Sequence, residues 1–129
     1  MARSSATGKN TDREPAHTEI VLRLRFPAHE PLLGPGKVEL MEHIEREGSI
    51  SAACRAMRMS YHRAWIIVGE INAMFREPLV VTQLGGAKGG GATITPLGRD
   101  VVRRYRSIET SIWKHASKHI AALEALAEN

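Results

Sequence analysis

Apolar and polar positions divide the chain into segments with different periodicities. Residues 1–16 contain almost no bulky apolar side chains, so we expect a disordered arm there and a folded unit over residues 17–129. Residues 17–26 alternate with a period of two, and one apolar face is made of Ile20, Leu22, Leu24 and Phe26. This alternation, rich in branched side chains, predicts a half-buried β-strand.

Three helices are predicted over residues 37–75, where apolar residues recur every three or four positions. The first runs from Lys37 to a stop at Gly48, and its apolar face is formed by Val38, Leu40, Met41 and Ile44. A short helix follows over residues 49–57, with Ser49 at its start and small residues on its inner face. Ser60 can cap the third helix, whose buried stripe we expect to be Ala64, Ile67, Val68, Ile71 and Phe75.

The second and third of these helices have the spacing of a helix-turn-helix, which we place over residues 49–75. Only Arg58 and Met59 separate the two helices, and small side chains stand where the helices would cross. The polar residues that open the third helix then project away from the core: Ser60, Tyr61, His62 and Arg63. We expect the Trp65 ring to seal the contact between the helices. A helical hairpin with no ligand stays open as an alternative at this point.

A β-hairpin wing is predicted after Pro78. Residues 79–84 and 92–95 are strand candidates, and the glycine-rich stretch 85–91 between them carries one lysine, Lys88. A wing tip of this kind can lie along a phosphate backbone or enter a minor groove. A phosphate-binding loop of a nucleotide hydrolase is not indicated, because no Lys-Ser or Lys-Thr pair leads from the glycines into a helix.

The last predicted element is a long helix that begins at Thr95 and Pro96, which suit the cap and the first helical position. Apolar residues recur along it at gaps of three or four over about thirty residues, or roughly 45 Å of helix. They are Leu97, Val101, Tyr105, Ile108, Ile112, Ala116, Ile120, Leu123 and Leu126. One small domain cannot cover such a stripe, so we expect this helix, from about residue 96, to pair with a second copy in a homodimer. Folding back on the chain's own core is the alternative.

Together these segments predict a fold that is mainly α with a small β wing, a winged helix-turn-helix with a long C-terminal dimerisation helix. The charge distribution adds a candidate partner. The net charge is +4, yet nine basic and only three acidic residues lie between Cys54 and Arg106, an excess of six. Basic charge concentrated in one part of a domain favours a polyanionic partner, although an ordinary solvated surface can give the same count.

Several classes of protein are disfavoured by the composition. No stretch approaches the roughly 20 apolar residues of a membrane span, and the first fifteen residues lack the apolar run of a secretory signal, so we expect a cytoplasmic location. Cys54 is the only cysteine, which excludes an internal disulfide and a Cys-rich metal site. His115 and His119 lie one helical turn apart without a clear third ligand, so no metal or cofactor is expected. No catalytic constellation is recognisable, so we do not expect an enzyme.

Three stretches of the sequence resemble a known family: "GSISAACRAMRMSYHRAW", "MFREPLV" and "GGAKGGGATITPLG". They are similar to the N-terminal, LysR-type winged helix-turn-helix domain of the ModE family, the molybdate-responsive transcriptional regulators. The resemblance implies a homodimer, joined through the long helices, that binds a palindromic operator. Ile66 is apolar where the family tends to have a polar residue, and Val81 and Thr82 replace a common Glu-Arg pair. Because the sequence ends at Asn129, we expect the family's oxyanion-binding domains, and with them direct molybdate sensing, to be absent.

The leading hypothesis is therefore a transcriptional regulator that binds double-stranded DNA as a homodimer on an inverted repeat. His62 and Arg63, with Tyr61, are expected to meet base edges in the major groove, where arginine suits guanine. Contacts to phosphates are expected from Ser49, Ser51, Arg55 and Ser60, and Lys88 would take the flanking backbone. A second hypothesis is a protein-interaction module, whose long helix forms mixed dimers with a full-length regulator or another partner.

Overall fold

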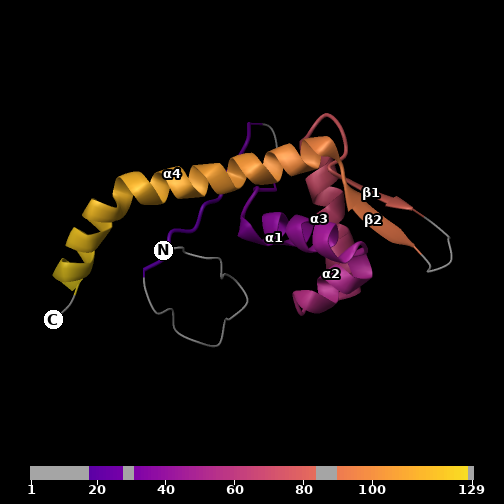
Figure 1. Ribbon diagram of the computed structural model, residues 1–129, viewed down its shortest axis with the longest axis horizontal. Helices are drawn as coiled ribbons and strands as arrows, with labels where there is room; N and C mark the ends of the chain where they lie inside the picture. The colour runs from indigo at the N-terminus through magenta and orange to yellow at the C-terminus, as the bar shows by residue number, and fades with distance from the viewer. Residues whose placement is uncertain (1–17, 28–30, 84–89, 128–129) are drawn as a thin grey trace.

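The computed structural model of the protein describes residues 18–27, 31–83 and 90–127. Within these ranges the elements are α1 (Pro35–Glu47), α2 (Ile50–Ala56), α3 (Tyr61–Met74), β1 (Val80–Gln83), β2 (Gly91–Ile94) and α4 (Pro96–Ala127). The helices α1, α2 and α3 gather beside the first part of α4, and the β1–β2 hairpin projects at the end far from the C-terminus (Figure 1). The predicted fold, mainly α with a small β wing, is confirmed. The arm predicted over residues 1–16 lies outside the described residues.

The boundaries of α1 follow from local backbone chemistry. The helix begins at Pro35, two residues before the predicted start, because proline lacks the N–H that a first helical residue leaves unpaired. It ends at Gly48, whose φ of 81° is left-handed and whose N–H donates to the Ile44 carbonyl at 2.8 Å. Glycine adopts this conformation without steric cost, so the chain can turn directly into α2.

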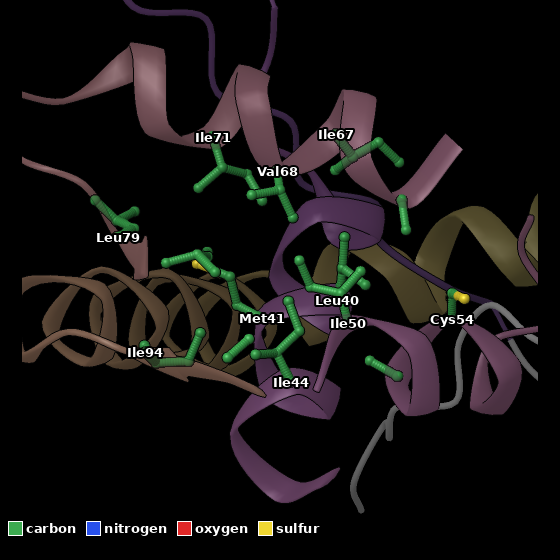
Figure 2. Close-up of a cluster of buried hydrophobic side chains, with 14 residues drawn as sticks. Leu40, Met41, Ile44, Ile50, Cys54, Ile67, Val68, Ile71, Leu79 and Ile94 are labelled. Atoms are coloured by element: carbon green, nitrogen blue, oxygen red, sulfur yellow. The ribbon is translucent and has the colours of Figure 1, made fainter. Parts of the chain in front are cut away.

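The main hydrophobic core lies between the first three helices and the base of the hairpin. Figure 2 shows Ile67, Val68 and Ile71 pointing from α3 toward side chains of α1 and α2. The fully or almost fully buried members on those two helices are Leu40, Met41, Ile44, Ile50, Ala53 and Cys54. Phe75, predicted as part of the α3 stripe, is only partly buried because α3 ends one residue earlier and Met74 takes the buried position. Its ring instead meets Phe26 edge to face at 5.7 Å.

The antiparallel hairpin β1–β2 is fixed at its base by side chains and by a close helix contact. The Asn72 carboxamide oxygen accepts the N–H groups of Leu79 and Val80 at 2.8 and 3.0 Å, which holds β1 against the end of α3. The Ala92 N–H donates to the Gly48 carbonyl at 2.9 Å and places β2 beside the start of α2. A Cβ on Gly98 would lie 2.6 Å from the Leu79 carbonyl oxygen, so only glycine lets α4 start this close to the hairpin.

The predicted N-terminal strand is extended but belongs to no sheet. Its burial alternates as predicted, yet a single antiparallel bridge, between Leu24 and Leu33, is formed among the described residues. Pro27 and Pro31 flank the connection to Leu33 and lack the N–H groups that a longer ladder requires. The strand predicted over residues 17–26 is therefore wrong: the segment is extended and alternately buried, but its described residues form no strand beyond that bridge. The segment lies along α4 instead, where the Tyr105 hydroxyl donates to the Leu22 carbonyl at 2.7 Å.

Helix α4 changes its surroundings along its length. Tyr105, only 1% exposed, sits in a second cluster with Leu33, Val38 and Met74. Beyond it the helix leaves the helical body (Figure 1), and Leu126 of the predicted apolar stripe is 80% exposed. Thr95 caps the helix as predicted, because its Oγ1 accepts the Gly98 N–H at 3.0 Å. No helix in the described part of the chain is both long and apolar enough to span a membrane.

Candidate nucleic-acid interface

Two serine caps define the starts of α2 and α3. The Ser49 Oγ accepts the Ala52 N–H at 3.0 Å, and the Ser60 Oγ accepts the Arg63 N–H at 3.0 Å. Both caps were predicted from the sequence and are confirmed. In each case the serine oxygen is the acceptor, so its hydroxyl hydrogen can still be donated to an anion. The positive end of the α3 dipole lies at the same place, which favours negative charge there.

The turn between α2 and α3 is closed by two backbone hydrogen bonds and an unusual arginine. The Met59 N–H donates to the Cys54 carbonyl at 2.9 Å and the Arg58 N–H donates to the Arg55 carbonyl at 3.1 Å. This is the Schellman pattern, in which the residue at the Arg58 position is left-handed and most often glycine. Arg58 has a φ of 58°, and no other non-glycine residue in the described ranges has a positive φ. Its exposed side chain therefore starts from the turn that precedes α3.

The first residues of α3 present their side chains to solvent. Tyr61, His62 and Arg63 are exposed, as is the cap Ser60, while Ala64 behind them is fully buried. The sequence predicted this orientation from the 3.6-residue period, and the structure confirms it. The structure therefore brings these four residues together at one end of the helix-turn-helix unit, residues 49–75. Their roles toward DNA stay predictions.

Trp65 lies elsewhere than predicted. Its ring is exposed and meets the Tyr61 ring edge to face, with centroids 6.0 Å apart. The sequence-based expectation that it seals the contact between α2 and α3 is wrong. Ala53 of α2 and Ala64 of α3 are both fully buried, whereas Trp65 is 41% exposed. One residue further along the helix is a rotation of about 100°, which carries Trp65 out of the core and onto the side of Tyr61.

The arginines of the helix-turn-helix unit have no acidic partner among the described residues. Arg55 donates to the Ser51 hydroxyl at 3.2 Å, so these two predicted phosphate contacts lie together on the exposed side of α2. No ion pair with Arg55, Arg58 or Arg63 is formed within residues 18–27, 31–83 and 90–127. Their charges are therefore not neutralised by this part of the chain.

The arginines at the start of α4, in contrast, are neutralised by carboxylates. Arg99 pairs with Glu45 of α1 at 2.7 Å, and Arg106 pairs with Glu42 at 2.7 Å as well as with Glu109. Hydrogen bonding to Glu42 raises the pKa of the Arg106 guanidinium above its ordinary value. Asp100 pairs with Arg103 and Arg104, and the hydrogen bond from Arg104 lowers the pKa of its carboxyl. The basic excess counted in the sequence is thus divided between a paired and an unpaired group.

The wing hairpin lies at the edge of the candidate site. Lys88, predicted to contact the flanking backbone, lies outside the described residues. The hairpin base does adjoin the α2 cap, through the hydrogen bond from Ala92 to Gly48, which is next to Ser49 in the chain.

On α4, the His115 Nδ1 lies 2.9 Å from the Ser111 carbonyl oxygen, and the described ranges hold no group of three or more metal-ligating side chains.

Sequence analysis did not single out Arg58 as a site residue and gave no role to Ile66. Arg58 could have been noticed because it occupies the turn position that glycine usually takes. Ile66 is 43% exposed on the outer side of α3, and its apolar character at a polar-facing position was the available signal.

No family model matches the chain. Among curated proteins, it is 43% identical over 77 residues to the molybdenum transport protein ModE of Azotobacter vinelandii, covering 60% of this chain and 28% of that protein. It is 40% identical over 82 residues to the molybdenum-pterin-binding protein MopB of Rhodobacter capsulatus, which covers 64% of this chain and 30% of MopB. The DNA-binding transcriptional dual regulator ModE of Escherichia coli K12 is 33% identical over 87 residues, with 67% and 33% covered.

The matched length sets what these similarities mean. The chain spans about a third of the length of the curated relatives it matches, and the match covers most of this short chain. By name, one of the three is a molybdenum transport protein, one a molybdenum-pterin-binding protein and one a DNA-binding transcriptional regulator, and none is named as an enzyme.

Proposed function

Because this chain is homologous to the N-terminal region of the ModE proteins, we propose that it binds double-stranded DNA and regulates transcription. The observation that carries this proposal is the exposed start of α3, where a capped helix end presents Tyr61, His62 and Arg63 without an acidic partner among the described residues. The second helix of a helix-turn-helix enters the major groove with such N-terminal residues first.

In this proposal the exposed side chains divide into base-reading and phosphate-binding groups. His62 and Arg63, with Tyr61, meet base edges, and the arginine fork fits the O6 and N7 atoms of guanine. Phosphates are bound by the hydroxyl groups of the two caps, Ser49 and Ser60, and by Ser51 and Arg55 on α2. Arg58 joins this second group because it is exposed in the turn just before α3. Lys88 would extend it along the wing.

We also propose that the protein is a homodimer joined through α4. Support comes from the part of the apolar stripe that the described chain leaves uncovered, which includes Ile108, Leu123 and Leu126. A second copy of the same helix can bury these side chains by coiled-coil-like packing. A symmetric dimer reads an inverted repeat whose half-sites lie about 34–36 Å apart, or a multiple of that distance.

Selection of bound sequences from random duplex DNA tests this proposal directly. We expect enrichment of an inverted repeat, and an affinity that falls steeply as salt rises, since each phosphate contact releases counterions. Recovery of no common sequence, together with binding that is insensitive to salt, would contradict DNA recognition. An enriched but asymmetric site would contradict the homodimer alone.

The exposed stripe of α4 also supports a second candidate, an interaction module that forms mixed dimers with a full-length regulator. The mass of the protein in solution, measured alone and after mixing with such a regulator, separates the two. A stable homodimer that retains its mass after mixing supports the first proposal. A monomer that forms a heterodimer supports the second. The cytoplasmic location stays a prediction.

A further inference from the structure

The outer face of α3 changes character one turn after its polar start. Residues spaced by four, three and four positions share one side of an α-helix, and on α3 this line is His62, Ile66, Gly69 and Ala73. All four are exposed, and they lie opposite the buried residues Ala64, Ile67, Val68 and Ile71. The line therefore begins with a polar side chain and continues with apolar and small ones.

Ile66 is the large apolar side chain on this line. It is 43% exposed, although a fully apolar side chain gains nothing from contact with water. Its neighbour Gly69 has no side chain, and a Cβ there would meet nothing within 4 Å. The helix surface is consequently low beside Ile66, so a partner that lies along α3 can approach the isoleucine without obstruction.

The position of Ile66 relative to His62 fits the base stack of a duplex. Four residues advance the helix by about 6 Å, which is close to two base-pair steps of about 3.4 Å each. A helix lying in the major groove with His62 at a base edge therefore brings Ile66 near a base edge as well. That edge cannot be recognised by a hydrogen bond, because the isoleucine side chain has no donor or acceptor.

We propose that Ile66 contacts the 5-methyl group of a thymine and selects an A·T pair at that position of the site. The thymine methyl is the apolar group that base edges present in the major groove, and the other three bases present donors and acceptors there. This inference rests on the proposed DNA binding and adds to it a base preference, set by a residue that lies one helical turn beyond the predicted base-reading group.

Deoxyuridine provides the test, since it differs from thymidine only by the lack of the 5-methyl group. Starting from a duplex recovered by the selection, each thymine is replaced by deoxyuridine in turn and the dissociation constant is measured by fluorescence anisotropy. Loss of one buried methyl group corresponds to a dissociation constant that is about three- to fourfold larger. We expect a loss of this size at one position of each bound half-site and little change elsewhere.

The Ile66→Ala variant identifies the side chain responsible. Alanine has the highest helix propensity and the position is exposed, so α3 is expected to stay folded, which circular dichroism checks. Ile66→Ala should bind the thymine and deoxyuridine duplexes equally. A matched control is Val21→Ala, another apolar residue, which is 50% exposed on the N-terminal segment rather than on α3 and should keep the wild-type difference.

The possible results separate this inference from the function on which it rests. If the wild type binds the recovered duplex but no deoxyuridine weakens it, or if Ile66→Ala keeps the same sensitivity, the thymine contact is wrong and DNA binding stands. If the wild type binds the recovered duplex no better than a scrambled one, the proposed function fails, and this inference fails with it.

Discussion

The helix-turn-helix unit and helix α4 carry the same kind of charged residue in opposite settings. In the unit, Arg55, Arg58 and Arg63 are exposed and have no acidic partner among the described residues. On α4, Arg99 and Arg106 reach across to the carboxylates of Glu45 and Glu42 on α1. The α4 arginines fasten one helix to another, whereas the charges of the unit are available to an external polyanion. Position in the fold, and not residue type, therefore determines which arginines are paired with carboxylates among the described residues.

Apolar side chains show the reverse difference between the same two regions. The inner face of α3 is almost completely buried, with Ala64 and Ile71 inaccessible to solvent. The distal part of α4 leaves Leu123 64% exposed, although the sequence periodicity of the two helices is alike. The helix-turn-helix unit thus buries its apolar face within the described chain, whereas the distal part of α4 leaves apolar side chains exposed.

The largest expected effect comes from truncating matched apolar side chains in the two regions. Ile71→Ala should lower the free energy of unfolding by about 2–5 kcal/mol, because it opens a cavity in a fully buried cluster. Leu123→Ala should change it by less than about 0.5 kcal/mol at concentrations where the protein is monomeric. Urea denaturation followed by circular dichroism measures both. Equal losses for the two variants at high dilution would show that the chain itself buries the distal part of α4.

The next effect separates the two groups of arginines. Arg63→Ala should weaken binding to a selected site by about 1–3 kcal/mol and relax its base preference. Arg104→Ala removes a cation that is already paired with Asp100 on the exposed surface of α4, so we expect a loss of less than about 0.5 kcal/mol. Titration of a labelled duplex, cognate and random, gives both values. A similar loss for the two variants would mean that net charge alone drives binding.

The features predicted correctly depend on near neighbours in the sequence. Ser49, Ser60 and Thr95 were identifiable as caps because a cap bonds an N–H three residues away. The buried positions of α3 from Ala64 to Ile71 followed from a period of 3.6 residues. Both features depend only on residues three or four positions apart, so they can be recognised from the sequence alone.

The features that were missed or wrong depend on partners far along the chain or on a dihedral angle. The carboxylates that pair with Arg99 and Arg106 lie 54 and 64 residues away, on α1. A strand is completed by a partner strand, and the predicted strand over residues 17–26 forms only one bridge among the described residues, between Leu24 and Leu33. The left-handed backbone of Arg58 depends on how the turn between α2 and α3 closes, which periodicity does not determine.

A smaller effect is expected at Tyr105, the residue after which α4 leaves the helical body. Tyr105→Phe removes its hydrogen bond to the Leu22 carbonyl and should cost about 1 kcal/mol of unfolding free energy at pH 7. Tyr61→Phe, at an exposed tyrosine of the helix-turn-helix unit, should change it by less than about 0.5 kcal/mol. Urea denaturation again provides the measurement, and equal effects would contradict the buried role of Tyr105.

The pH dependence sharpens the same comparison. Burial raises the pKa of Tyr105 from its ordinary value of 10.0 to about 12. The pKa of Tyr105 is higher in the folded protein than in the unfolded chain. The contribution of its neutral hydroxyl to the free energy of unfolding is therefore complete below pH 10 and is lost as the pH rises toward 12. The wild type should therefore lose stability over this interval more steeply than Tyr105→Phe, whose phenyl ring does not titrate. Parallel losses of the two proteins would show that the Tyr105 hydroxyl is not responsible.

The smallest effect is expected at Arg58, where stability and binding should change in opposite directions. Arg58→Gly removes the steric cost of a left-handed non-glycine residue but makes the unfolded chain more flexible, so we expect a net gain of about 0.5–1 kcal/mol. If Arg58 binds a phosphate, the same change should weaken binding to all duplexes alike and lower the slope of log affinity against log salt by about 0.9. Arg58→Ala is the control, since it removes the charge without relieving the backbone: it should lose affinity equally and gain no stability. If both variants gain stability, the destabilisation at Arg58 comes from its guanidinium group and not from its backbone. If both variants bind DNA as the wild type does, Arg58 does not belong to the phosphate-binding group.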